Sequence, residues 1–212
     1  PYTNFSARTF RDTFVQSGEI FFVADGVLSI PLAIDPLILY WNRTLFENAG
    51  LVDAPKTWKE VTDITERLTE KDVNENILSS AISLGTPNNI SYFKEILSLL
   101  FLQIGNPLVK SESTETSTRY FSYLDDPQTK DGLEKALSFF VSFVDPTSTV
   151  YTWNRVRPED QDAFVGEQSA MYIGFAHELP EIRDRNPNIN FDIAQVPQVD
   201  GSKTKMTFGR LY

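Results

Sequence analysis

Few side chains of this sequence could carry out covalent chemistry. It has one histidine, His177, so a serine- or cysteine-type catalytic arrangement would depend on that residue alone. There is no Gly-x-Ser-x-Gly elbow and no Gly-x-x-x-x-Gly-Lys-Ser/Thr loop, hence no motif for a hydrolase nucleophile or a bound phosphate. The absence of cysteine excludes disulfides and thiolate metal sites within these residues. We therefore expect no cofactor and no metal.

Two pairs of neighbouring carboxylates could serve acid–base chemistry. Asp125-Asp126 and Glu159-Asp160 offer the residue type that glycoside hydrolysis needs, which is two carboxylates at a defined separation. Both pairs stand at predicted helix starts, where capping and the helix dipole account for acidic residues. We therefore predict that the chain is not an enzyme.

The composition excludes some classes of partner. Among 212 residues, 29 are Asp or Glu and 19 are Lys or Arg, which gives a formal net charge of −10. Such a surface repels phosphate backbones, so we expect no nucleic-acid partner. No apolar run approaches the length of a membrane-spanning helix, and no signal-peptide pattern opens the sequence.

Residues 31–61 give the clearest prediction of the strands and helices that would position a site. The apolar run 37–41 has the length and composition of a buried strand. Asn42 is placed to cap a helix over 43–49, and Gly50 to end it. Thr57 with Glu60 forms a capping-box pattern for a second helix that begins at Trp58.

The rest of the chain alternates strands and helices. We predict helices over 5–17, 58–71, 90–104 and 126–144 and another from Pro158, with strands at 19–23, 27–31 and 80–84. Asp25-Gly26 indicates a hairpin turn, and the polar stretch 110–119 predicts an exposed or mobile loop. This order favours an α/β fold with a layered sheet covered by helices.

Three blocks of the sequence carry a resemblance to a known family. Residues 31–61, PLAIDPLILYWNRTLFENAGLVDAPKTWKEV, closely resemble a block of bacterial extracellular solute-binding proteins, the sugar-binding, maltose-binding-protein-like class that serves ABC importers. DAFVGEQSAMYIG (162–174) and NPNINFDIAQVP (186–197) are similar to later blocks of the family, in the right order. The resemblance implies one lobe of a periplasmic-binding-protein-like (type II) two-lobed fold.

The resemblance also implies a function. The chain would bind a small hydrophilic solute, with a carbohydrate as first choice, in an interlobe cleft and deliver it to the permease of an ABC transporter by hinge closure. An extracellular glycan hydrolase that uses cleft carboxylates is the alternative, and a lobe repurposed for protein interaction is a third reading. Peptide, polyamine or metal ligands also remain open.

The expected domain organisation follows from the same resemblance. Residues 1–206 would be the second lobe, with hinge segments near 31–36 and 197–209, and residues 207–212 would begin the return into a first lobe that is mostly absent. A compact one-domain relative is the alternative. We expect a monomer located outside the cell or in the periplasm, membrane-associated through a lipid anchor on the missing N-terminus.

Four candidate ligand-binding residues come from family positions near strand ends. Asp35 matches an acidic position that faces the cleft in the family, although it could equally be a turn or hinge residue before Pro36. Asn88, Asn89 and Tyr92 match a region that contributes cleft contacts, with helix capping and surface packing as the competing explanations.

Three aromatic candidates complete the predicted site. Trp153 lies in a predicted loop, where it could stack on a sugar ring or pack against the next helix. His177 stands at or near a position where sugar binders often carry a stacking Trp, and this departure puts the usual sugar platform in question. Phe175 could supply the missing ring face.

Overall fold

The computed structural model describes residues 6–23, 26–113, 118–122, 124, 126–202 and 205–212, and the chain divides into two compact units. The small unit comprises Pro1–Pro36 with Gly209–Tyr212, and the sheet unit comprises Leu37–Phe208. The first division follows residues 31–36, and the second lies within residues 197–209. The assignment of lobes stays a prediction.

The small unit is built around Phe10. It contains α1 (Ala7–Thr13), the 3-10 helix η1 (Gln16–Phe21) and a short antiparallel pair, β1 (Phe22–Val23) and β2 (Gly26–Val27). The buried ring of Phe10 lies 4.9 Å from those of Phe14 and Phe22. The prediction of a strand over 19–23 was wrong for most of its length, because residues up to Phe21 form the 3-10 helix. Asp25 of the predicted turn lies outside the described residues.

The sheet unit contains a mixed sheet in the order β9–β3–β8–β5–β4. Strand β3 (Ile34–Asn42) runs antiparallel to both β8 (Ser169–Phe175) and β9 (Phe191–Gln195). Strand β8 is parallel to β5 (Ile77–Ile82), which pairs antiparallel with β4 (Glu70–Lys71). The first residues of β3, which belong to the small unit, pair with β10 (Gly209–Leu211).

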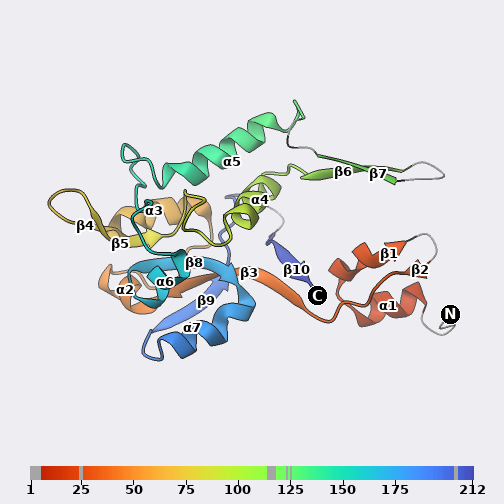
Figure 1. The fold of residues 1–212 in the computed structure, drawn as a ribbon, viewed down its shortest axis with the longest axis horizontal. Coiled ribbons are helices and arrows are strands. Elements are labelled where there is room, and N and C mark those ends of the chain that lie inside the picture. Colours follow the sequence, from red (N-terminus) through yellow and green to blue (C-terminus); the bar gives the residue numbers. More distant parts are fainter. Residues whose placement is uncertain (1–5, 24–25, 114–117, 123, 125, 203–204) are drawn as a thin grey trace. The chain divides into compact units, whose positions relative to one another are not determined.

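Helices cover both faces of this sheet (Figure 1). Alternate residues of β3 point to opposite faces. Leu37, Leu39 and Trp41 join the larger core cluster, and Tyr40 joins the smaller one. The helices that contribute most to the larger cluster are α2 (Arg43–Asn48), α3 (Trp58–Leu68), α4 (Phe93–Gln103) and α5 (Lys130–Ser142), and Ala163 adds to it from the helix before β8. The smaller cluster is formed with α6 (Asp160–Val165) and α7 (Leu179–Arg185). The predicted α/β fold is confirmed.

The predicted caps of the first two helices of the sheet unit are confirmed. The side chain of Asn42 accepts a hydrogen bond from the Leu45 N–H at 3.0 Å, and α2 is followed by Gly50 at a φ of +68°. The Thr57 hydroxyl accepts from the Glu60 N–H at 3.2 Å. The Glu60 carboxylate accepts from the Lys56 N–H, one residue before the expected partner. Local sequence therefore determines where these helices begin.

The stretch 110–119 was predicted as a loop, and this was wrong for its described residues. Strands β6 (Val109–Ser113) and β7 (Thr118–Ser122) form an antiparallel ladder in which Glu112 lies opposite Arg119 and Lys110 opposite Phe121. Cross-strand pairs of opposite charge stabilise such a ladder despite its polar composition. In the part of the chain that the structure describes, no helix is long and apolar enough to cross a membrane.

Candidate ligand-binding site

The candidate site lies at one end of the sheet unit. Strands β5 and β8 are parallel, so the segments that follow them emerge at the same edge of the sheet. Residues 83–92 connect β5 to α4, and the 3-10 helix η2 (Ala176–Glu178) connects β8 to α7. Open α/β sheets place their ligand crevices outside the carboxyl ends of strands. Six of the seven predicted site residues lie in the sheet unit, and several of them are in contact at this edge.

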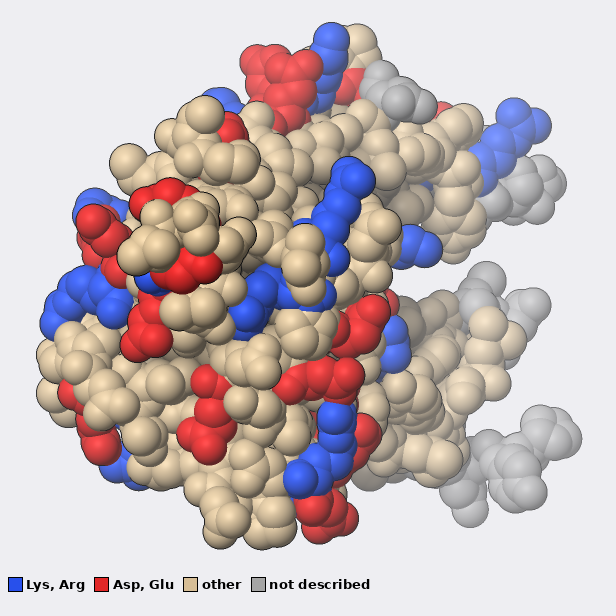
Figure 2. All heavy atoms as spheres, turned by 60° about the vertical axis from the view of Figure 1, so that its left-hand side comes forward, with Lys and Arg blue, Asp and Glu red and all other residues tan. Residues whose placement is uncertain are grey.

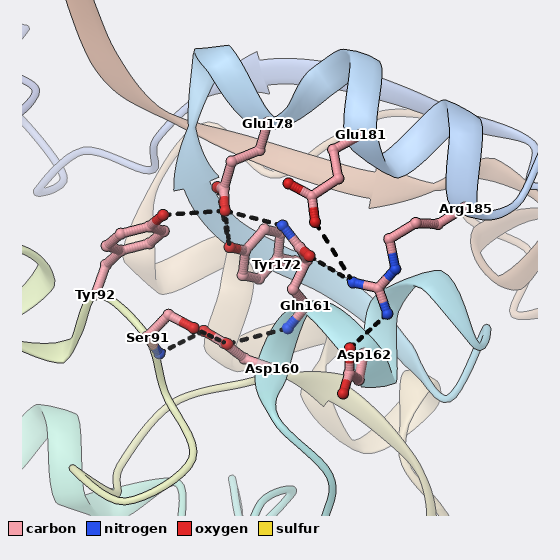
Figure 3. Close-up of polar contacts among 9 residues, drawn as sticks. All are labelled: Ser91, Tyr92, Asp160, Gln161, Asp162, Tyr172, Glu178, Glu181 and Arg185. Carbon is pink, nitrogen blue, oxygen red and sulfur yellow. Dashed lines mark hydrogen bonds and ion pairs between the residues drawn. The ribbon is translucent and has the colours of Figure 1, made fainter.

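Glu178 is the centre of a polar network at this edge (Figure 3). Its Oε1 accepts hydrogen bonds from Tyr92 Oη at 3.0 Å and Gln161 Nε2 at 2.9 Å. Its Oε2 accepts from the Phe175 N–H at 2.9 Å, and Tyr172 Oη lies 3.0–3.1 Å from both oxygens. The side chain is buried, and four donor groups thus take the place of water around its carboxylate.

A second buried carboxylate, Asp160, joins α6 to the segment before α4. It accepts from the N–H of Ser91 at 3.0 Å, from the Ser91 hydroxyl at 2.7 Å and from the Gln161 N–H at 3.0 Å. The prediction that helix capping alone explains this acid was therefore incomplete, because two of its three partners lie outside its own helix. These bonds hold Asp160 as a structural acceptor, which argues against its use as a catalytic acid.

Burial changes the proton affinity of three groups in this network. Burial raises the pKa of Asp160 to about 6, and the hydrogen bonds from Ser91 and Gln161 only partly oppose that rise. Burial also raises the pKa of Glu178, against hydrogen bonds from Tyr172, Tyr92 and the Phe175 N–H that lower it. The pKa of Tyr172 is raised, first by burial and then by the nearby carboxylates. Tyr172 therefore acts as a hydrogen-bond donor to Glu178.

Asn89 and Trp153, both predicted as ligand contacts, are buried and bonded to the protein itself. The amide nitrogen of Asn89 donates to the carbonyls of Asn154 and Arg157 at 3.0 and 2.9 Å. Its oxygen accepts from Trp153 Nε1 at 3.0 Å and from the Thr86 hydroxyl. Trp153 is fully buried. This structure gives both residues a packing role, and their role as ligand contacts stays untested.

Three other candidates form an aromatic group that ends at the surface. The Tyr92 ring meets the Phe175 ring edge-on, with centroids 4.9 Å apart, and Phe175 stacks with His177 at 6.2 Å and 28°. Phe175 is fully buried, Tyr92 is half-buried and His177 is exposed. Asn88 and Ser91 are also exposed. A solute at this edge would therefore meet His177, Asn88 and Ser91, with the Tyr92 ring beside them.

Asp35, the remaining candidate, belongs to the small unit. It is 6% exposed and lies opposite Arg210 in the pairing of β3 with β10. The prediction that it faces a ligand cleft stays a prediction.

Sequence reasoning missed the four residues that connect this site internally: Gln161, Tyr172, Glu178 and, as a network member, Asp160. Their sequence context gives little indication that they belong to a polar network, because Tyr172 lies in an apolar strand and Glu178 in a segment of mixed polarity. The available signal is an acidic residue three positions after a strand that is buried throughout.

The described residues show no group of three or more His, Asp or Glu side chains that could hold a metal ion. On the face shown in Figure 2, acidic and basic side chains are interspersed among uncharged ones. The charge distribution on that face is thus a mixed one.

The comparisons with known proteins bear on the family and the fold of the chain. The family model of the bacterial extracellular solute-binding proteins matches residues 17–209. The chain belongs to this family. The resemblance seen in the sequence is thereby confirmed, and membership of a family of binding proteins supports the prediction that the chain is not an enzyme. A search of curated proteins found no match.

Solved structures of solute-binding proteins share the fold. CpMnBP1 with mannobiose bound is 21% identical, has a TM-score of 0.66, and is covered over 49% of its length by 94% of this chain. An ABC transporter solute-binding protein from Thermotoga lettingae, bound with α-D-tagatose, is 19% identical with a TM-score of 0.62, and the match covers 90% of this chain and 45% of that one.

A cyclo/maltodextrin-binding protein complexed with maltotetraose is 17% identical and has a TM-score of 0.67. The match covers 97% of this chain and 48% of that one. The chain thus spans about half the length of the solved structures that it resembles.

Proposed function

We propose that this solute-binding protein takes a carbohydrate at the edge formed by the ends of β5 and β8. The main support is the arrangement found there: the exposed residues His177, Asn88 and Ser91, with the half-buried ring of Tyr92 beside them. Sugars offer hydroxyl edges and apolar ring faces, which such a mixture of polar groups and one ring can bind. The three similar proteins described above were solved with mannobiose, tagatose and maltotetraose.

The proposal requires a protein of two lobes. The chain covers about half of each similar structure, so the described edge supplies half of a binding site, and the rest of a two-lobed protein supplies the other half. In this proposal the sheet unit is the second lobe, 31–36 and 197–209 contain the hinges, and closure on the solute creates the form that an ABC permease recognises. The protein would act outside the cell, held by a lipid anchor.

A thermal-shift and calorimetry screen of the full-length protein tests the ligand class. Mannobiose, maltotetraose and tagatose are compared with spermidine and a mixed tripeptide. A sugar at about one hundred times its dissociation constant raises the stability of the folded state by roughly 2.7 kcal/mol. A shift with spermidine or the tripeptide and none with any sugar would overturn the carbohydrate proposal.

A pair of variants tests the location. His177→Ala removes the exposed ring at the proposed edge and should weaken sugar binding about tenfold, since one good contact contributes on the order of 1 kcal/mol. Val73→Ala is the control, because Val73 is 99% exposed in the turn between β4 and β5. Equal affinities for the two variants would place the site elsewhere.

A further inference from the structure

Glu178 connects segments that are far apart in the sequence. Its four donors come from the residue before α4 (Tyr92), from α6 (Gln161) and from β8 (Tyr172 and the Phe175 N–H). The carboxylate itself lies in η2, immediately after His177. One side chain thus joins the two segments that follow β5 and β8 (Figure 3).

The orientation of this network is fixed from a further element. Arg185 of α7 donates to Gln161 Oε1 at 2.6 Å and to Asp162 Oδ1 at 2.5 Å. Because the oxygen of the Gln161 amide receives Arg185, its nitrogen is directed to Glu178. Asp160 then ties the same helix to Ser91. The network therefore specifies the positions of Ser91 and Tyr92 relative to η2.

Burying the carboxylate of Glu178 costs free energy, because burial disfavours its charged form. An apolar side chain of similar size would avoid that cost. Such a replacement would also leave two tyrosine hydroxyls, an amide and a backbone N–H without their acceptor. No apolar residue can hold those four groups toward one point. The carboxylate is thus suited to defining geometry.

Glycine 174 shows how closely the carboxylate fits. A Cβ built on Gly174 would collide with Glu178 Oε2 and with the ring of Tyr172. Because Gly174 has no side chain, the carboxylate of Glu178 can pack against β8 next to the turn that contains His177. The chain therefore has space for Glu178 at the point where the segment after β8 leaves the sheet.

We infer that Glu178 is a positioning residue of the solute site, which locks the segment 88–92 and the turn 175–178 into one arrangement. The inference rests on the proposed function for its ligand. Glu178 itself is only 5% exposed. It acts through its neighbours, by holding His177 on one side and Ser91 with Tyr92 on the other in the mutual position that a sugar would meet.

The first test needs no ligand. Amide hydrogen exchange is measured on the full-length protein and on Glu178→Gln, with Glu66→Gln as the control because Glu66 is exposed on α3. In Glu178→Gln, exchange should rise at least about tenfold in both 88–93 and 174–178, with 37–41 unchanged. A rise confined to 174–178, or an equal rise in all three segments, would overturn the inference.

A second variant guards against loss of folding. Tyr92→Phe removes one hydroxyl and leaves the carboxylate in place, so its effect should cross the network and raise exchange at 174–178. His177 provides a spectroscopic reporter, because it is the only histidine of these residues and stacks on Phe175. Its ring proton signals should move in Tyr92→Phe and in Glu178→Gln. Unmoved signals in both variants would contradict the inference.

The last measurement separates this inference from the proposed function. Maltotetraose and mannobiose are titrated into the unaltered protein, Glu178→Gln and Glu66→Gln. We expect about tenfold weaker binding for Glu178→Gln and no change for Glu66→Gln. Equal affinity in all three overturns the positioning role. If the unaltered protein binds neither sugar while exchange remains coupled across the two segments, the carbohydrate proposal fails by itself.

Discussion

The indole N–H of Trp153 donates to the side-chain oxygen of Asn89 at 3.0 Å, in the interior of the sheet unit. Sequence reasoning assigned both residues to ligand binding, and their types suit that role. In the structure the two side chains are hydrogen-bonded to each other, and the amide nitrogen of Asn89 also donates to the carbonyls of Asn154 and Arg157. This bond joins the segment after β5 to the loop before α6. It therefore stabilises the segment after β5, which forms part of the candidate edge.

Asn89→Ala should destabilise the protein strongly. The change leaves the buried Trp153 N–H and the carbonyls of Asn154 and Arg157 without their partner, at a cost of about 3 kcal/mol. Urea unfolding gives the free energy difference. Asn88→Ala is the matched control, because Asn88 is exposed and its replacement should cost less than about 0.5 kcal/mol. Similar values for the two variants would contradict the structural role of Asn89.

Thr57→Ala should destabilise α3 at its start. Its hydroxyl accepts from the Glu60 N–H, and loss of an N-cap of this type costs about 1 kcal/mol. Thr62→Ala serves as the control inside the same helix, where the hydroxyl bonds only to the Lys59 carbonyl. We expect a change within about 0.5 kcal/mol there. Chemical denaturation followed by circular dichroism distinguishes the two, and an equal loss would refute the capping role.

Asp160 should make stability depend on pH between 4 and 7. Its carboxyl has a pKa of about 6 in the folded protein, against 3.8 without the burial that raises it. The folded state holds the proton more tightly, so this contribution to stability is complete below pH 3.8 and is lost as pH rises through 6. Its size is on the order of 3 kcal/mol. The same direction holds for the pKa of Glu178.

Asp160→Asn isolates that contribution. Free energies of unfolding are measured at pH 4, 5, 6 and 7, and the variant should gain stability relative to the unaltered protein as pH rises. Asp72→Asn is the contrasting control, since hydrogen bonds from Asn76 lower the pKa of Asp72 and its contribution is lost on acidification. A difference between Asp160→Asn and the unaltered protein that does not change with pH would show that this carboxyl is not the titrating group.

Gly174→Ala should disturb the network directly. The new methyl group would press on the Tyr172 ring and the Glu178 carboxylate, and overpacking of this kind costs about 1–3 kcal/mol. Gly209→Ala is the control, because the nearest atom to its added carbon lies at 3.7 Å and an effect within about 0.5 kcal/mol is expected. Urea unfolding compares them, and an unchanged stability for Gly174→Ala would show that the site has room to adjust.

Local signals predicted the elements of the sheet unit best. The caps at Asn42 and Thr57 depend on hydrogen bonds three residues away, so a short window of sequence contains all that determines them. Long ranges were less accurate: the helix predicted over 90–104 forms only from Phe93, and the strand predicted over 80–84 occupies Ile77–Ile82. The ladder of β6 and β7 was missed because its stability comes from pairing between two separate strands.

Periodicity, caps and ordered motifs were enough to predict the family and the α/β fold, because these signals lie within short stretches of sequence. Which candidate side chains reach the surface became clear only from the folded structure. Burial and hydrogen-bond partners depend on residues distant in the sequence: Trp153 points inward to Asn89, whereas His177 remains exposed. The role of Glu178 also depends on the folded structure, because folding brings its four hydrogen-bond donors to one point.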